Sequence, residues 1–305
     1  MGHYYLVQKL KGNDMNNSIK TNQPVLHNRE KMTRIIADFW DKTTDGWREI
    51  WGPHIHHGYY ETAQSLTPLQ AQEALIDKII EMINLPHHAK VLDAGCGMGG
   101  SSIYLAKKFN ANVTGITLSK RQADIARKQC QTENIHTIDF KIEDALTLES
   151  FADNSFDIIW SLESCEQFYD KNLFIKNAYR VLKPGGKLML ATWCSDRESY
   201  EGELAKSYKK LCDAFDLPYM PTMQTYQEYL INNKFTVTKM DDWSANVKQS
   251  WDIGLSLANT YSFLKVIKLG GWRGFRFLQQ VKLMRDAFHH DRVKYGVFLA
   301  IKPQT

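Results

Sequence analysis

The stretch over residues 90–106 constrains the fold more than any other part of the chain. Its sequence, KVLDAGCGMGGSSIYLA, holds a short apolar run up to Asp93, four glycines within six residues, and the start of a second apolar segment. This order predicts a buried strand, a turn and a helix. A turn without Cβ atoms lets a ligand approach the backbone, and a helix N-terminus favours an anionic group. The stretch therefore suits a nucleotide-like cofactor, and Ser101 and Ser102 are placed to cap the helix.

The spacing of Gly95, Gly97 and Gly100 matches G-x-G-x-x-G, which dinucleotide enzymes and methyltransferases share. A nicotinamide enzyme needs an Asp or Glu about 20 residues further on, where it binds the ribose hydroxyls. The second predicted strand, residues 112–116, is instead followed by Thr117 and Ser119. The sequence therefore argues against an oxidoreductase.

Strand and helix signals alternate along the rest of the chain. Further strands are predicted to end near residue 142 and to cover residues 156–160, 187–193, 234–239 and 295–301. Thr67 and Pro68 begin a helix that Pro86 ends, and Ser119 caps another with Gln122 at its third position, as in a capping box. This alternation is typical of an α/β fold.

Several motifs carry a resemblance to a known family, and they cover residues 51–60, 114–119 with Gln122, 160–164, 191–194 and 241–243. Over residues 38–303 the chain resembles class I S-adenosylmethionine-dependent methyltransferases and, more narrowly, the γ-tocopherol methyltransferase-like family. The resemblance implies a Rossmann-like sheet of seven strands, the last antiparallel, with N-terminal lid helices and a C-terminal helical cap insert. It also implies S-adenosyl-L-methionine as the cofactor and S-adenosyl-L-homocysteine as the product.

The chain is expected to divide into four parts. Residues 1–31 are polar and lack periodicity, which predicts a flexible tail. Residues 32–66 are the aromatic lid segment, residues 67–198 the S-adenosylmethionine-binding core, and residues 199–305 the remaining strands with the substrate-cap helices.

The resemblance places the cofactor contacts at the glycine turn and after the neighbouring strands. In this fold an acidic side chain after the third strand commonly binds the adenine amino group. The alternative is that such a residue is only an acidic side chain in a solvated loop. The cofactor-binding residues implied are Asp93, Gly95, Gly97, Gly99, Thr117, Leu118, Gln122, Asp144, Ala145 and Ser161.

The acceptor chemistry is expected after the fourth strand, where similar methyltransferases tend to carry Glu-His and this chain has Glu166 and Gln167. A glutamine amide does not act as a general base. This leaves Glu163, Glu166, or a His or Tyr of residues 54–60 as the base, and His56 is the histidine chosen. Two carboxylates would also stabilise a developing cation. The competing interpretation, which applies above all to Glu166, is that Glu163 or Glu166 caps the next helix or pairs with a lysine.

Aromatic and histidine side chains cluster in the lid segment and recur near the end of the chain. Aromatic rings exclude water and attract a sulfonium or carbocation, although many such residues simply pack in the core. His54, His56 and His57 lack an established metal-ligand spacing, so no metal is expected. The predicted substrate-binding residues are Trp40, Trp51, His54, His57, Tyr59, Tyr60, Gln167, Trp193 and Trp272.

The predicted function is methyl transfer to a small lipophilic acceptor, favoured as C-methylation of a prenylated or terpenoid natural-product-type molecule, with a prenyl diphosphate as one candidate. The alternatives are N-methylation of an indole or alkaloid amine, and ring C-methylation of a tocopherol-like phenol. A methyltransferase-fold cyclase or a cofactor-binding protein that transfers no methyl group is the alternative of another class.

Composition limits the partners and the location. The net charge is only +4 without a Lys/Arg-rich run, so no nucleic-acid partner is expected. No apolar run reaches the length of about 18 residues that an integral membrane segment needs. The five cysteines are scattered and fit a reducing cytoplasm rather than a disulfide framework. A homo-oligomer is compatible with the sequence.

Overall fold

The computed structural model describes residues 18–24, 28–61, 65–260 and 272–304, although not the side chains of residues 258–260 and 272–278. Much of the predicted tail, residues 1–17 and 25–27, lies outside this part of the chain. In the described part, β1 (Ile19–Lys20) pairs antiparallel with β7 (Ser199–Tyr200). No helix of the described residues is long and apolar enough to cross a membrane.

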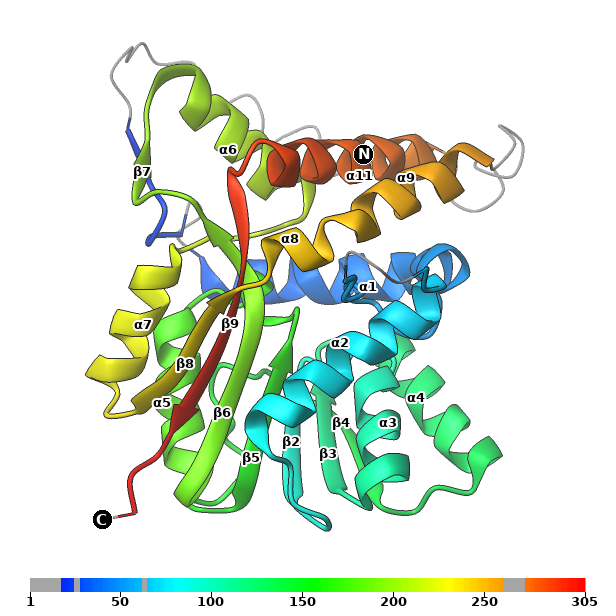
Figure 1. Ribbon diagram of the computed structural model, residues 1–305, viewed down its shortest axis with the longest axis vertical. Coiled ribbons are helices and arrows are strands. Elements are labelled where there is room, and N and C mark those ends of the chain that lie inside the picture. The colour runs from blue at the N-terminus through cyan, green and yellow to red at the C-terminus, as the bar shows by residue number, and fades with distance from the viewer. Residues whose placement is uncertain (1–17, 25–27, 62–64, 261–271, 305) are drawn as a thin grey trace.

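A seven-stranded sheet forms the centre of the molecule, in the order β4-β3-β2-β5-β6-β9-β8 (Figure 1). Strands β2 to β6 run parallel, and β9 runs antiparallel to both of its neighbours. This arrangement confirms the predicted α/β class. The strands are β2 (Lys90–Ala94), β3 (Asn112–Thr117), β4 (Ile138–Ile142), β5 (Phe156–Leu162), β6 (Leu182–Ser195), β8 (Thr236–Asp242) and β9 (Val293–Ile301).

The two faces of the sheet bury separate hydrophobic cores, because successive side chains of a strand point to opposite faces. Val91 of β2 packs on one face with α2 (Pro68–Ile83). Its neighbour Leu92 packs on the other face with α5 (Lys171–Val181) and α7 (Met223–Asn232). This double covering explains the continuous apolar runs of the two central strands, residues 158–160 of β5 and residues 188–191 of β6.

Helix starts follow the sequence signals in two of three cases. Thr67 and Gln70 form the capping box of α2, and Ser119 accepts a bond from the backbone of Gln122 at the start of α4 (Lys120–Glu133). The side chain of Gln122 bonds to Thr117 rather than completing a second box. For α3 (Gly100–Phe109) the prediction was wrong, because the cap is Gly99 and no side chain caps the helix.

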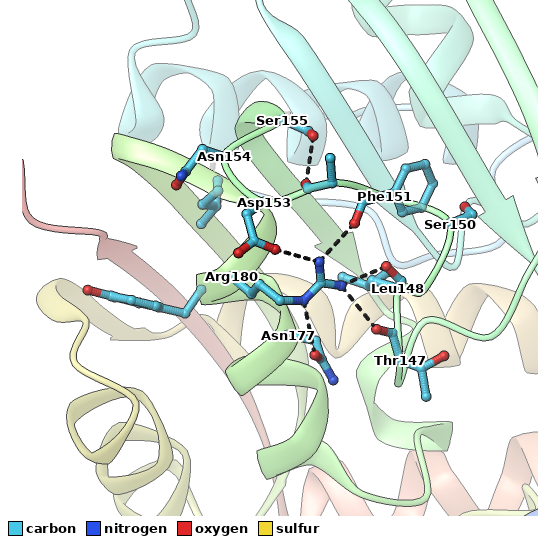
Figure 2. A network of polar contacts seen from close by, with 12 residues as sticks. Thr147, Leu148, Ser150, Phe151, Asp153, Asn154, Ser155, Asn177 and Arg180 are labelled. Carbon is cyan, nitrogen blue, oxygen red and sulfur yellow. Dashed lines mark hydrogen bonds and ion pairs between the residues drawn. The ribbon is translucent and has the colours of Figure 1, made fainter.

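Arg180 of α5 fixes the loop between β4 and β5 (Figure 2). Its guanidinium donates to the carbonyl oxygens of Leu148 at 2.7 Å and Phe151 at 2.8 Å, and to the carboxylate of Asp153 at 2.9 Å. A planar group with five N–H donors can hold several acceptors of one loop at once. The loop that begins at the end of β4 is therefore tied to the helix behind it.

Helices that do not belong to the sheet layers cover the end of the molecule at which β2, β3 and β5 terminate (Figure 1). Helix α1 lies between the sheet and the helices at the top of the view. These covering elements are α1 (Arg29–Trp51), α6 (Gly202–Ala214), α8 (Ser244–Val247), α9 (Gln249–Thr260) and α11 (Trp272–His289).

Candidate active site

A cleft with about 990 Å³ of empty space, open to solvent, lies at the carboxyl ends of the parallel strands and under α1. We call it the strand-end cleft; open α/β sheets bind their ligands at this edge. Eight of the ten predicted cofactor residues line it: Asp93, Gly95, Gly97, Thr117, Leu118, Gln122, Asp144 and Ala145. Thr33, Ile36 and Trp40 of α1 form its roof.

The glycines of the turn have different surroundings. Gly97 has φ +54°, and a Cβ built on it would meet no described atom within 4 Å. At Gly95, with φ +84°, a Cβ would lie 2.8 Å from Ser164 Oγ and closer still to Ser164 Cβ. A Cβ on Gly99 would lie 2.6 Å from the ring of Phe140. Gly97 therefore opens the turn to a ligand, whereas Gly95 and Gly99 allow close packing within the protein.

Gly99 and Ser161 are the two predicted cofactor residues that do not line the cleft in the described structure. Ser161 is fully buried, and its hydroxyl lies 2.8 Å from Ser164 Oγ, which in turn donates to the carbonyl oxygen of Ala94 at 2.6 Å. Ser161 therefore holds the end of β5 against the end of β2.

Asp93 lies at the floor of the cleft and accepts a hydrogen bond of 2.6 Å from Ser102 Oγ. Burial raises the pKa of Asp93 to about 7, and the hydrogen bond from Ser102 only partly opposes this effect. Ser102 was expected to cap α3, but its hydroxyl is engaged by this carboxyl group instead.

Polar contacts fasten α1 to the rim of the cleft. Arg29 pairs with Asp144 at 3.2 Å, while the other oxygen of Asp144 accepts from the backbone of Leu146 at 2.9 Å. Asp41 accepts from Ser119 Oγ at 2.6 Å and from the backbone N–H of Arg121 at 3.0 Å. The second contact places a carboxylate at the N-terminus of α4, where the helix dipole favours it.

A second cavity, with about 550 Å³ of empty space, adjoins the strand-end cleft. We call it the aromatic pocket, after the side chains that form most of its wall: Phe39, Trp40, Trp47, Trp51, Trp193, Phe215 and Trp251. Its polar residues are His56, His57, Glu163, Glu166 and Gln167. Trp40, Ile55, His56, Glu163 and Gln167 line both cavities, so a ligand in one cavity lies close to a ligand in the other at these residues.

Glu163 is the carboxylate at this junction, in a left-handed conformation with φ +50°. Its side chain accepts from the backbone N–H of His57 at 2.8 Å and from Tyr295 OH at 2.8 Å, and lies 2.7 Å from His57 Nδ1. Burial alone would raise the pKa of Glu163, but the charge of His57 and its hydrogen bonds outweigh burial and lower the pKa. Glu163 is therefore an ionised carboxylate in a site that is almost closed to water.

Glu166 has the opposite character. Burial, and then the nearby charge of Glu163, raise the pKa of Glu166 to about 8, so its carboxyl group is largely protonated at neutral pH. It does not cap α5, which Asp170 caps, and its carboxyl group bonds to Thr192. Lys171 Nζ reaches only the main-chain oxygen of Glu166, at 3.1 Å. Both structural roles considered for Glu166 in the sequence were wrong.

His56 is a neutral imidazole at the junction. Burial lowers its pKa, and its Nδ1 lies 2.8 Å from the carbonyl oxygen of His57. Because a carbonyl only accepts, Nδ1 carries the proton and Nε2 holds the lone pair. Nε2 has no hydrogen-bond partner among the described residues. His54 lines the strand-end cleft instead, and burial lowers its pKa to about 3.

The remaining predicted substrate residues fall into three groups. Trp40, Trp51, His57, Gln167 and Trp193 line the aromatic pocket. Tyr59 packs edge-on against Trp243 at 5.1 Å, and Tyr60 borders a smaller cavity beside α9, so neither lines the pocket. The side chain of Trp272 lies outside the described residues.

Sequence reasoning did not assign four further wall residues of the aromatic pocket. The helical spacing of the aromatic residues in α1 could have predicted Phe39 and Trp47, since they share one helical face with Trp40 and Trp51. Phe215 and Trp251 come from distant segments, and nothing in their local sequence marks them as pocket residues.

Comparisons with known proteins agree with this geometry. The family model for a methyltransferase domain matches residues 92–190, the part of the chain that contains the glycine turn and the strand ends. Fold, site and family model together define an enzyme that transfers a methyl group from S-adenosyl-L-methionine.

The wider chain matches whole proteins. Tocopherol O-methyltransferase, chloroplastic, of Arabidopsis thaliana is 33% identical over 291 residues, which cover 90% of this chain and 83% of that protein. The 2-methyl-6-phytyl-1,4-hydroquinone methyltransferase of Synechocystis sp. is 31% identical over 284 residues, 88% of this chain and 87% of that protein. The crystal structure of the cyclase SpnF superposes with a TM-score of 0.77 at 25% identity, covering 90% of this chain and 97% of that one. The chain belongs to the tocopherol methyltransferase-like family of class I S-adenosylmethionine-dependent methyltransferases.

Proposed function

We propose that this enzyme methylates a carbon of a small prenylated acceptor, and that this carbon belongs to an electron-rich phenol ring. The observation that carries the proposal is the ionised carboxylate of Glu163 at the junction of the strand-end cleft and the aromatic pocket. The names of the two related methyltransferases, which act on a tocopherol and a phytyl hydroquinone, support the choice of a phenol ring.

The strand-end cleft fits S-adenosyl-L-methionine. The open space at Gly97 admits a ligand close to the backbone, and Thr117, Gln122 and Asp144 supply polar groups around it. The bound cofactor supplies an electrophilic methyl group. Glu163 then faces the region in which the cofactor and the acceptor meet.

Transfer of a methyl cation to a neutral ring builds positive charge on the acceptor. A carboxylate about 4 Å from this charge attracts it by roughly 4 kcal/mol at an effective dielectric constant of about 20, and the charge of His57 beside Glu163 takes away part of this gain. The rings of Trp40 and Trp51 add attraction through their faces. Because Glu163 is held in place by His57 and Tyr295, little reorganisation is needed when the charge appears.

His56 completes the reaction as the base. The acceptor carbon forms its bond to the methyl group while the methyl–sulfur bond breaks, and the sulfur keeps that electron pair. The same carbon then loses its proton to the lone pair of His56 Nε2, and the ring recovers its aromaticity. A neutral imidazole of low pKa is basic enough, because a cationic ring is a strong acid.

The acceptor is proposed to carry no diphosphate at the reacting end. Among the described residues that line the two cavities there is no lysine or arginine to bind one. A terpenoid alkene is the second candidate, because Glu163 would stabilise its carbocation in the same way. The cytoplasmic location expected from the sequence remains part of this proposal.

The test is methyl transfer from labelled S-adenosyl-L-methionine to a geranyl hydroquinone, by the wild type and by Glu163→Gln. Losing the charge while keeping the size should lower kcat at least about 100-fold. The affinity for S-adenosyl-L-homocysteine should change less than threefold. Glu203→Gln, on the exposed face of α6, is the matched control and should keep the wild-type rate. Undiminished turnover by Glu163→Gln would remove the carboxylate from the mechanism.

A further inference from the structure

Gln167 joins the lid helix to the cap. It lies in a short 3₁₀ turn, η1 (Cys165–Gln167), directly after the loop that carries Glu163. Its Oε1 accepts from Trp40 Nε1 at 2.7 Å, and its Nε2 donates to the main-chain oxygen of Phe215 at 3.0 Å. An indole nitrogen only donates and a carbonyl oxygen only accepts, so these partners fix the orientation of the amide.

The two bonds connect opposite walls of the site. Trp40 of α1 belongs to the roof of the strand-end cleft and to the aromatic pocket, and Gln167 lines both cavities as well. Phe215 follows α6 and lines the aromatic pocket but not the strand-end cleft, and its ring meets Trp193 edge-on at 5.4 Å. The amide of Gln167 therefore connects the roof of the strand-end cleft with the opposite wall of the aromatic pocket.

The base of this bridge is rigid. Lys171 is fully buried at the start of α5, and its Nζ donates to the main-chain oxygens of Glu166 at 3.1 Å and Phe168 at 2.9 Å. These bonds hold the main chain on both sides of Gln167, so this residue cannot easily move with Trp40 or with Phe215 alone.

We propose that Gln167 is a positioning residue that couples cofactor binding to closure of the aromatic pocket. A ligand in the strand-end cleft contacts the roof residues of α1 and holds that helix down. Trp40 then fixes the amide, and the amide fixes the Phe215 main chain. The inference rests on cofactor binding in the cleft and not on the identity of the acceptor, so it stands or falls separately from the phenol proposal.

Three substitutions separate the contributions of the two hydrogen bonds that Gln167 makes to Trp40 and Phe215. Gln167→Glu keeps an acceptor for Trp40 but has no donor for the Phe215 oxygen. Trp40→Phe keeps an aromatic wall but removes the indole N–H. Gln167→Met keeps the length of the side chain and removes both bonds. Gln167→Glu is the most conservative of the three, and all three are compared at equal fractions of folded protein.

The experiment is hydrogen exchange of the full chain with and without saturating S-adenosyl-L-homocysteine. In the wild type the ligand should slow exchange at least threefold both in α1 and in residues 211–217, where the N–H groups of Phe215 and Leu217 are hydrogen-bonded. In each variant the slowing in α1 should remain, whereas that in residues 211–217 should fall below 1.5-fold. A simple loss of stability would instead speed exchange with and without the ligand alike.

Two results would overturn the coupling. One is a wild type in which the ligand leaves residues 211–217 unchanged. The other is a Gln167→Met protein that keeps the full ligand-dependent slowing of that segment. Neither result depends on an acceptor, so a wrong choice of acceptor class leaves this test intact.

Discussion

Gly95 and Gly97 lie two residues apart in the glycine turn, and they should respond differently to the same added methyl group. Both have positive φ, so alanine at either position costs about 1–2 kcal/mol of backbone strain. At Gly97 the new Cβ meets no described atom within 4 Å, so strain is the whole cost to the fold. At Gly95 the Cβ overlaps Ser164, which must move and loosen its bond to Ala94.

The magnitudes follow from these surroundings. Gly97→Ala should lower the unfolding free energy by about 1 kcal/mol, which is about 2–4 °C in Tm for a domain of this class. Because the methyl group projects into the cleft, the affinity for S-adenosyl-L-homocysteine should fall at least about tenfold, or 1.4 kcal/mol. Gly95→Ala adds about 1–3 kcal/mol of overpacking to the strain, so its Tm should fall about two to four times as far.

Thermal unfolding and calorimetric titration with S-adenosyl-L-homocysteine measure both quantities. A Gly97→Ala protein that binds the product as tightly as the wild type would refute the placement of the cofactor at this turn. Equal stability of the two variants would refute the packing argument for Gly95.

Two further predictions concern charge. The folded-state pKa of Glu166, about 8, lies above the ordinary glutamate pKa of 4.5, so the folded state holds the extra proton between these values. The free energy of unfolding should therefore fall as the pH rises from 4.5 to about 8. Glu166→Gln should flatten the profile of denaturant midpoint against pH. An unchanged slope would show that Glu166 does not cause this pH dependence. Asp41→Ala removes two contacts that fasten α1 to the start of α4. Dissociation of S-adenosyl-L-homocysteine should therefore speed up about 5- to 50-fold in stopped-flow measurements. An unaltered rate would mean that α1 does not hold the ligand in place.

The sequence was sufficient where the determining contacts are local. The apolar run before Asp93, the capping residues Thr67 and Ser119, and the glycine spacing each act within a few residues, and the structure has the strand and both caps as predicted. The cap of α3 was mispredicted because Ser102 has a stronger partner in Asp93, which is already present in the preceding strand.

The acceptor side depends on long-range contacts that no local pattern reports. Trp251 and Phe215 come to the aromatic pocket only through the packing of the cap helices on one another. The bridging role of Gln167 needs Trp40 and Phe215 at once, which lie 127 and 48 residues away in the chain. From the sequence alone, Gln167 was predicted to bind the substrate and to stand where similar enzymes have a histidine base, and its two bonding partners were not predicted.

The position of the transferred methyl group tests most directly whether this enzyme methylates a ring carbon. The wild-type enzyme is incubated with a geranyl hydroquinone and S-adenosyl-L-methionine labelled with carbon-13 in the methyl group, and the product is examined by two-dimensional NMR. Ring C-methylation predicts a labelled methyl group bonded to a ring carbon. Label on a phenolic oxygen, or no labelled product from this acceptor, would contradict it.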